Sequence, residues 1–406
     1  MKNLGNFFFI FSLFLGPYLA IKSLYFSHIL IAVFLGIMLL KVVKFKKINV
    51  LYYKKWYIVL PYFGVFWMIA SILWSDSISF SIAYFIYYLI GLSIIFILVH
   101  HFSFNEEISF IVKSITVTLI IVIPIAFLEM FTSFRLPLAP SQYTGSDTEP
   151  TVFWGNPNNF ATVLNLVLPF VLFSKNKFKW LGAIIFFIVI YYTNSRLNLI
   201  AFLGIVGLYF LIEDKKKLLY FTLSLCGVTV FMSILSDSFK ALLQKVYVNF
   251  VEIYDAILEF LKMNNTADFD SMGTRQNLLL HGIEGLIDSN LFGVGAGASP
   301  MLHIGWLGET GAMHNFWIEI LVEQGAVFFV LFIVWYMYLI IKNYYIFKQN
   351  SSDYRNRFAG AISISLTGFI IGALSPSSTI YMLPMWLFLG LAMISIFINE
   401  ENKGEQ

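Results

Sequence analysis

Long apolar runs separated by short polar breaks recur along the whole chain of 406 residues. Many runs approach the ~20 residues that a helix needs to cross a hydrocarbon core of roughly 30 Å. Since backbone groups in lipid must find their partners inside the protein, helices are expected to make these crossings. The pattern predicts about twelve spans, at residues 5–22, 24–43, 56–75, 78–99, 108–130, 158–174, 179–194, 196–213, 218–236, 314–341, 357–374 and 381–399. We therefore predict an all-α polytopic membrane protein.

The distribution of basic residues predicts the orientation of these spans, because cytoplasmic loops carry an excess of Lys and Arg. With the N-terminus inside, all but seven of the 26 Lys and Arg residues fall in cytoplasmic stretches. The seven exceptions are Lys22, Arg135, Arg196, Lys240, Lys245, Lys262 and Arg275. An even number of spans with both chain ends in the cytoplasm is therefore expected.

Composition supports a membrane protein, with 59% hydrophobic and only 12% charged residues. The apolar run beginning at Phe7 is interpreted as a retained helix rather than a signal peptide, because a second span follows at once. The single Cys226 excludes a disulfide within one chain. The net charge of +3 is small and the basic residues do not alternate with aromatic ones, so nucleic-acid binding is not expected.

Polar segments divide the chain into three parts. Residues 1–236 carry the first nine spans and an outer loop at 131–157, residues 237–313 form a large outer loop, and residues 314–406 carry the last three spans. Apolar spacing within the large loop predicts an amphipathic helix over 239–262 and a shorter helix over 274–287. Long loops in compact proteins usually carry function, so function is expected on the outer face.

Two outward-facing arginines are candidate anion ligands. Arg196 lies in the short hairpin between the seventh and eighth spans, where it either extends to lipid head groups or binds phosphate through its guanidinium. Arg275 lies at the start of the loop helix, where it is either a solvated surface charge or a second phosphate ligand.

His314 begins the tenth predicted span and is the candidate base. At a helix N-terminus, the positive end of the dipole favours the neutral imidazole, which can accept a proton. The alternative is a structural or capping histidine. On a straight helix Asn315, Glu319 and Glu323 share one stripe, and His314 is turned about 100 degrees away from Asn315. The glutamates are therefore candidates to orient neighbouring groups rather than direct partners of His314.

Two turn motifs lie near the predicted outer ends of spans. The glycines of "GVGAG" from Gly293 could bring backbone N–H groups to a phosphate, but no P-loop continuation follows, so a tight turn is the favoured interpretation. Asn156 and Asn158 belong to a turn that starts the sixth span, and their amides are candidates to bind sugar hydroxyls. His281 and His303 have no neighbours that distinguish them from structural residues, and no cluster shows metal-ligand spacing, so neither a metal nor a cofactor is expected.

The order of these motifs resembles the O-antigen ligase and polymerase superfamily. The shared elements are Ser195–Arg196 opening a span, a long outer loop with Arg275 and "GVGAG", then His314–Asn315 followed by "ILVEQG". A "GNPN" turn at residues 155–158 precedes an earlier span. The motifs cover about residues 150 to 340, and the span count and loop pattern cover the whole chain.

The resemblance implies a GT-C-like, metal-independent membrane glycosyltransferase in the bacterial cytoplasmic membrane, acting at its outer face. It implies an undecaprenyl-diphosphate-linked oligosaccharide donor, a glycan or lipid-linked glycan acceptor, and other polysaccharide-assembly proteins as partners. It assigns diphosphate binding to Arg196 and Arg275 and acceptor activation to His314. Asn315, Glu319, Asn156 and Asn158 remain candidate substrate-binding or supporting residues. A single displacement at the anomeric carbon would invert its configuration.

Two alternatives stay open. Polymerisation of repeat units and ligation of a finished glycan differ only in the acceptor, and nothing in the sequence separates them. A transporter or flippase for lipid-linked sugars is the alternative from another class. It should carry charged or broken spans near the midplane, whereas the polar features here gather on the outer face.

Overall fold

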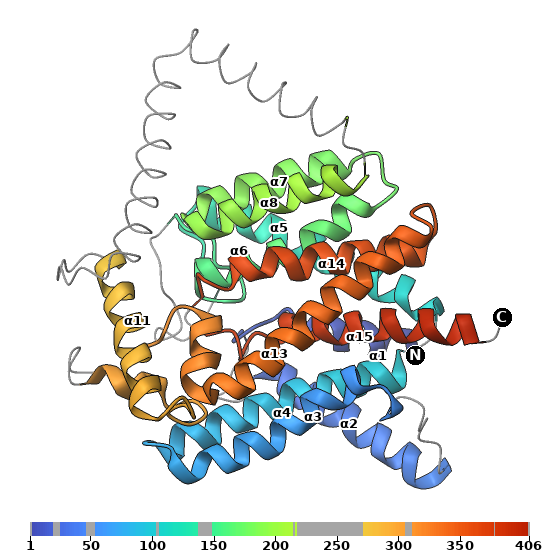
Figure 1. Cartoon of the computed structure of the whole chain (residues 1–406). Coiled ribbons are helices and arrows are strands. Elements are labelled where there is room, and N and C mark those ends of the chain that lie inside the picture. Colours follow the sequence, from blue (N-terminus) through green and yellow to red (C-terminus); the bar gives the residue numbers. More distant parts are fainter. Residues whose placement is uncertain are drawn as a thin grey trace, which may run out of the picture. The chain divides into compact units, whose positions relative to one another are not determined.

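In the computed structural model, the part of the chain described comprises residues 2–18, 25–45, 53–102, 105–136, 148–213, 216, 271–304, 311–376 and 378–404. Its regular elements are helices (Figure 1). They are α1 (Lys2–Ser12), α2 (Phe26–Phe45), α3 (Trp56–Ser71), η2 (Ile72–Trp74), α4 (Ile78–His101), α5 (Asn105–Phe131), α6 (Pro157–Phe173), α7 (Lys179–Tyr192), α8 (Arg196–Glu213), α11 (Ser271–Asp288), η4 (Ser299–His303), α13 (Phe316–Gln349), α14 (Tyr354–Gly372) and α15 (Leu383–Gly404).

The chain forms two compact units. The first contains residues 1–205 and 282–406, and the second contains residues 206–281. The predicted ninth span, the predicted amphipathic helix at 239–262 and Cys226 lie outside the described residues. The predicted loop helix at 274–287 is confirmed as α11.

Six described helices are long and apolar enough to cross a membrane. They are Trp56–Trp74, Ile78–His101, Ile108–Phe131, Arg196–Glu213, Phe316–Gln349 and Leu383–Glu401; shorter apolar helices are Phe26–Leu40, Pro157–Phe173 and Lys179–Tyr192. Three prolines, Pro61, Pro124 and Pro169, lie inside helices, which membrane helices tolerate because neighbouring groups satisfy the freed carbonyls. The predicted helical fold is confirmed over the described residues, and its long apolar helices are consistent with a polytopic membrane protein.

The predicted bounds of the first, tenth and last spans differ from those of the helices. The first span was expected at 5–22, but α1 ends at Ser12 and turns follow it. Its 11 residues extend only about 16 Å at the usual helical rise, too short to cross a bilayer. The tenth span begins at Phe316 rather than 314 and continues to Gln349. The last helix reaches Gly404, beyond the predicted 399.

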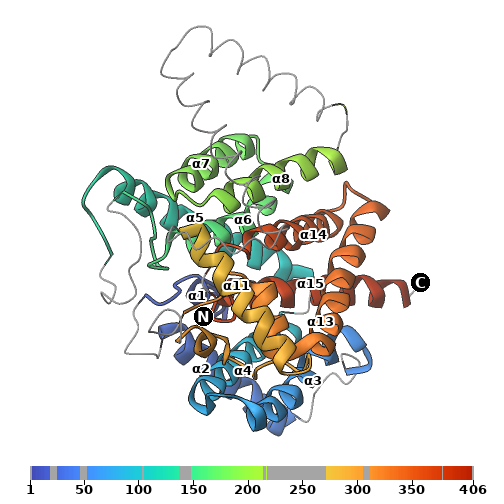
Figure 2. The same cartoon turned by 60° about the vertical axis from the view of Figure 1, so that its left-hand side comes forward.

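Helix α15 is the most enclosed of the candidate spans. It packs against α4, α14, α13 and α6 within the first unit (Figure 2). A Cβ at Gly91 of α4 would collide with the indole of Trp386, so the glycine lets the two helices approach closely. Close approach through small residues is the usual way in which membrane helices associate.

Helix α14 lies between α6 and α13, and a hydrogen bond from a side-chain hydroxyl to a backbone carbonyl links it to each of them. Ser365 donates to the Leu166 carbonyl at 2.7 Å, and Tyr336 donates to the Leu366 carbonyl at 2.6 Å. Such bonds satisfy buried polar groups where water is absent. They fix how far α14 can slide along its neighbours.

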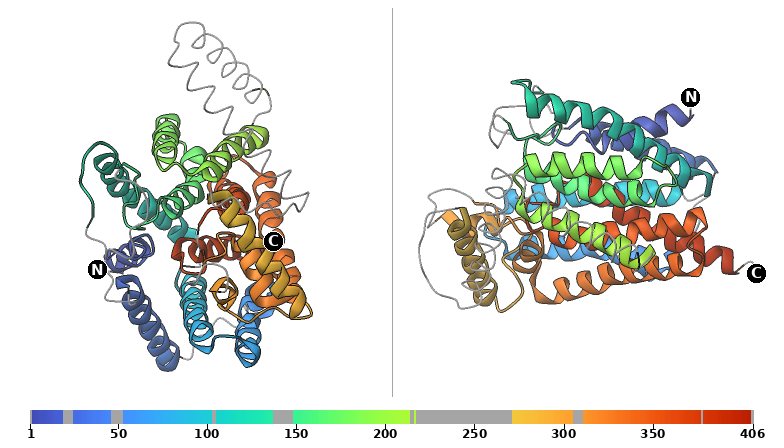
Figure 3. Two further views of the ribbon diagram at one scale, coloured as in Figure 1. Left: turned by 90° about the vertical axis from the view of Figure 1, so that its left-hand side faces the viewer. Right: turned by 90° about the horizontal axis from the view of Figure 1, so that it is seen from above.

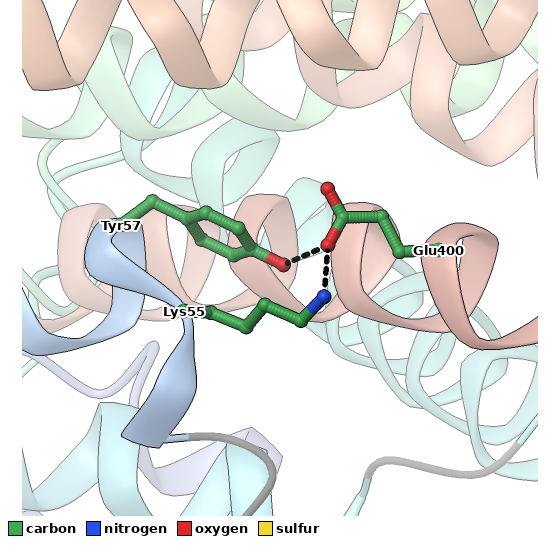
Figure 4. Close-up of polar contacts among 3 residues, drawn as sticks. All are labelled: Lys55, Tyr57 and Glu400. Atoms are coloured by element: carbon green, nitrogen blue, oxygen red, sulfur yellow. Dashed lines mark hydrogen bonds and ion pairs between the residues drawn. The ribbon is translucent and has the colours of Figure 1, made fainter. Parts of the chain in front are cut away.

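An ion pair joins the N-terminal end of α3 to the C-terminal end of α15. Lys55 lies 2.8 Å from a carboxylate oxygen of Glu400, and the Tyr57 hydroxyl donates to the same oxygen at 3.3 Å (Figure 4). Both ends of the chain lie at this end of the bundle, along which the helices run side by side (Figure 3). The opposite end holds the start of α6, α8 and α13, where the candidate site lies.

Candidate functional site

The loop between α14 and α15 connects the predicted site segments. The Phe316 amide donates to the Ala373 carbonyl at 3.1 Å, and the Ser195 and Ser375 hydroxyls lie 3.0 Å apart. Ser378 donates to a Glu319 carboxylate oxygen at 2.7 Å. This loop therefore holds the segments before α8 and α13 next to each other, although they are far apart in the sequence.

A buried polar network lies beneath the start of α8. The fully buried Asn198 donates to Ser195 at 2.9 Å and to the Asn158 carbonyl at 3.3 Å. Its side-chain oxygen accepts hydrogen bonds from Thr162 and Asn165, each at 3.1 Å. Because buried polar groups are stable only when paired, this network fixes the starts of α6 and α8 relative to each other.

Replacing Asn198 with alanine should destabilise the protein by about 1–3 kcal/mol, because four hydrogen bonds of its buried side chain, to Ser195, Asn158, Thr162 and Asn165, are lost together. Thermal unfolding in detergent measures the change. Thr116→Ala is a suitable control, since Thr116 is exposed and bonds only within its own helix at Val112. Equal melting temperatures for both variants would contradict a structural role of the network.

Arg196 is the first residue of α8 and is exposed. The residues around it are anchored: Thr193 and Ser195 are buried, and Asn194, in a left-handed conformation with φ 53°, donates to Glu149 at 2.7 Å. The hairpin thus holds the backbone firmly while it presents the guanidinium at the surface.

His314 lies outside the helix that it was expected to begin. It is half-buried, precedes the N-cap Asn315, and has a left-handed backbone with φ 49°. This conformation costs a non-glycine residue about 1–2 kcal/mol, and such strain is often found at functional sites. The interpretation of His314 as a helix cap is therefore wrong, since the neighbouring asparagine is the cap.

Asn315 and Asn156 both cap helices. The Asn315 side-chain oxygen accepts from the Trp317 and Ile318 amides, and that of Asn156 accepts from the Asn158 and Asn159 amides. Asparagine is favoured at this position because it satisfies amides that have no partner within the helix. The Asn158 side chain instead accepts from Ser375 at 2.7 Å. These bonds favour supporting roles for the three asparagines.

Helix α13 breaks at Gly325, so Glu319 and Glu323 lie on a short helix that precedes the long one. Gly325 has φ 79° and ψ 170°, a conformation nearly restricted to glycine. Glu323 accepts from the Gly297 amide at 2.9 Å and from the Ser299 hydroxyl at 2.7 Å. Both glutamates are buried, and Glu323 fixes the glycine-rich loop.

The amides of the glycine-rich stretch are already bonded. Val294 donates to the Val322 carbonyl at 2.9 Å, and Gly295 donates to the Glu323 carbonyl at 3.1 Å. Ala296 donates to the Ser71 hydroxyl, and Gly297 donates to the Glu323 carboxylate. These N–H groups are used inside the protein, which favours the predicted tight turn over a phosphate cradle.

Substituting Gly325 by alanine should lower stability by about 2–4 kcal/mol, because the new Cβ requires a strained backbone and collides with the Phe292 carbonyl. Thermal unfolding again provides the measurement. A Cβ at Gly204 of α8 meets nothing within 4 Å, so Gly204→Ala should leave stability unchanged or slightly raised. If Gly325→Ala matches this control, the kink does not depend on glycine.

The remaining predicted positions lie elsewhere. Arg275 lies in the early part of α11, in the second unit, and its role stays a prediction. His303 is fully buried, with its Nε2 atom 3.2 Å from the Met313 sulfur. Among the described residues, no group of three or more His, Cys, Asp or Glu side chains could hold a metal ion.

The sequence interpretation missed Asn198, Thr162, Ser375 and Ser378. Their only sequence signal was polarity inside or beside an apolar run, which also occurs at ordinary helix ends. Which of these residues meet depends on how α6, α8 and α14 pack.

Comparisons with known proteins agree with the order of the motifs. A family model described as O-antigen ligase matches residues 181–333, a segment that contains Arg196, Arg275 and His314. The teichuronic acid biosynthesis protein TuaE of Bacillus subtilis (strain 168) is 24% identical over 361 residues, which cover 84% of this chain and 72% of that protein. No solved structure matches. The family match over residues 181–333 and the likeness to TuaE support the resemblance of the chain to the O-antigen ligase and polymerase superfamily.

Proposed function

We propose that this membrane protein transfers a glycan from an undecaprenyl-diphosphate-linked oligosaccharide to a sugar hydroxyl. The match to the O-antigen ligase family model and the likeness to TuaE support a role in surface-polysaccharide assembly. The proposal adds the donor, an inverting and metal-independent reaction, and a site at the outer face of the bacterial cytoplasmic membrane. Arg196 and Arg275 bind the diphosphate, and His314 accepts the proton.

The observation that carries this proposal is the attachment of two site segments to one short loop. Ser195 precedes Arg196 and bonds to Ser375, while Phe316 follows His314 by two residues and bonds to Ala373. Arg196 and His314, which were predicted from separate motifs, therefore both lie within two residues of a residue bonded to the stretch 373–375.

Helix ends at this loop favour an anionic ligand. The N-termini of α6, α8 and α13 all have residues bonded to 372–375. Asn156 and Asn315 already accept from free amides of α6 and α13, but each N-terminus still carries a partial positive charge that attracts an anion. Together with the exposed Arg196, these dipoles supply positive potential where a diphosphate would lie.

The proposed reaction is a single displacement. The acceptor oxygen forms a bond to the anomeric carbon as the bond from that carbon to the diphosphate oxygen breaks, and the electron pair leaves with undecaprenyl diphosphate. His314 takes the hydroxyl proton as the oxygen attacks. The arginines offset the negative charge that develops on the leaving group. Asn315, Asn156, Asn158 and Glu319 hold the helix starts and the loop around these groups.

The proposal includes the predicted topology. It comprises about twelve spans in a GT-C-like arrangement, cytoplasmic chain ends, and three parts at residues 1–236, 237–313 and 314–406. The pairing of Lys55 with Glu400 supports a common side for the two stretches to which they belong, both of which are predicted to face the cytoplasm. Other polysaccharide-assembly membrane proteins are the proposed partners.

The test places the purified full-length chain in liposomes with undecaprenyl-diphosphate oligosaccharide and follows the formation of glycosidic bonds. New bonds with inverted anomeric configuration are expected. Lipid flipping without new bonds would instead identify a transporter. Supplying either a second lipid-linked repeat or a finished glycan acceptor then separates polymerisation from ligation.

A further inference from the structure

A groove of about 700 Å³ runs between α13 and α15 at the end of the bundle away from the candidate site. Val334, Met337, Ile341 and Tyr345 line it from one face of α13 and are 36–60% exposed. Their spacing of three or four residues places them along a single stripe. The groove therefore offers a continuous apolar channel open to the surroundings of the helices.

The polar end of the groove is lined by Lys342, Gln349, Asn399 and Glu400. The Asn399 amide donates to the Gln349 side-chain oxygen at 3.4 Å. These amides can exchange hydrogen bonds with hydroxyl groups, as well as with each other. An elongated apolar channel ending in hydrogen-bonding groups suits a lipid better than a soluble metabolite.

Of the two charged side chains that line the groove, Lys342 is the one whose charge can attract a ligand. Glu400 lines the groove but is paired with Lys55 at 2.8 Å (Figure 4). Lys342 is exposed, with its ammonium 5.8 Å from the centre of the Tyr338 ring. Because the positive charge of Lys55 neutralises the negative charge of Glu400, the remaining charge of Lys342 makes the groove favour an anionic ligand.

Aromatic side chains mark this level as a membrane interface. The ring centres of Trp56 and Tyr338 lie 4.7 Å apart, and those of Tyr57 and Tyr338 lie 5.6 Å apart. Trp and Tyr gather where head groups meet the hydrocarbon core. Basic pockets between membrane helices at the cytoplasmic side bind anionic lipid head groups.

We propose that an anionic diacyl phospholipid of the cytoplasmic leaflet binds in this groove. One acyl chain lies along Val334, Met337 and Ile341, and the phosphate lies at Lys342. Gln349 and Asn399 bond to head-group hydroxyls. The choice of leaflet rests on the proposed topology, whereas the site is independent of the proposed glycosyl transfer and its test needs no catalytic activity.

The experiment compares lipid retention by the full-length protein in mixed micelles with phosphatidylglycerol or phosphatidylcholine, measured by native mass spectrometry. Wild-type protein should retain phosphatidylglycerol preferentially. Lys342→Gln should lower this preference about five-fold, the effect of one basic residue near a membrane surface. Lys348→Gln is the matched control, since Lys348 is also exposed and lies 5.6 Å from the Tyr344 ring but does not line the groove.

A second variant tests the channel itself. Met337→Trp fills the apolar wall and should reduce retention of phosphatidylglycerol while leaving Lys342 in place. Equal losses in the Lys342 and Lys348 variants would overturn the proposal, because they would indicate general surface charge. Full retention by Met337→Trp, or displacement of the lipid by inorganic phosphate alone, would overturn the role of the groove as a lipid site.

Discussion

Replacing His314 by alanine is expected to lower glycosidic bond formation by about 10²–10⁴-fold, the usual contribution of a positioned general base. The imidazole is half-buried beside the start of α13, and its removal leaves the acceptor proton without an acceptor. Product formation in liposomes, measured with saturating donor and acceptor, checks this result.

His314→Gly separates the side chain from the backbone. Glycine adopts the left-handed conformation at φ 49° without strain, so this variant should unfold at the same temperature as the alanine variant or above it. It should nevertheless be equally inactive. An active glycine variant beside an inactive alanine variant would show that the backbone conformation, rather than the imidazole, is what activity requires.

His100→Ala provides the control. His100 lies in the last turn of α4, and its Nε2 atom is 3.0 Å from the Tyr53 hydroxyl at the opposite end of the bundle. Activity close to that of wild type is expected. Full activity of His314→Ala would exclude His314 as the base.

Arg196→Ala is expected to lower turnover by about 10²–10³-fold, comparable to the loss of one group that stabilises developing negative charge. Arg196→Lys should recover only part of this loss, because an ammonium keeps the charge but loses the planar fork that binds two phosphate oxygens. Initial rates with the lipid-diphosphate donor measure both effects, and Arg275→Ala in the same assay tests the second proposed guanidinium.

Arg135→Ala is the matched control for these arginines. Arg135 belongs to the other predicted outer loop and donates to the Glu129 and Phe134 carbonyls. Its replacement should change the rate less than two-fold. A comparable loss in the Arg135 and Arg196 variants would indicate a general effect of outer positive charge, and the diphosphate role of Arg196 would fail.

The sequence predicted the helical membrane fold because the hydrocarbon core imposes long apolar segments wherever the chain crosses it. Helix ends were less predictable. Ser12 ends α1 within an apolar stretch, and α13 continues beyond its predicted end at 341 through Lys342 to Gln349. In both places the local pattern of apolar and polar residues does not show where the packing of the helix against its neighbours stops, so it does not show where the helix ends.

The kink at Gly325 also required the tertiary structure. A glycine inside an apolar run is compatible with an unbroken membrane helix. Its left-handed backbone is needed only because Phe292 approaches closely and the Ala326 amide bonds to Leu291. The same packing places Glu323 against the glycine-rich loop, a contact that no spacing rule predicts.

The sequence alone indicated the class of protein, its resemblance to the superfamily and the three site candidates Arg196, Arg275 and His314, because these depend on composition and on the order of motifs. Tertiary structure decided which segments meet. The pairing of Ser195 with Ser375 and of Phe316 with Ala373 arises between residues far apart in the chain. Hydrogen bonds depend on separations of about 3 Å, and such separations exist only once the helices have packed.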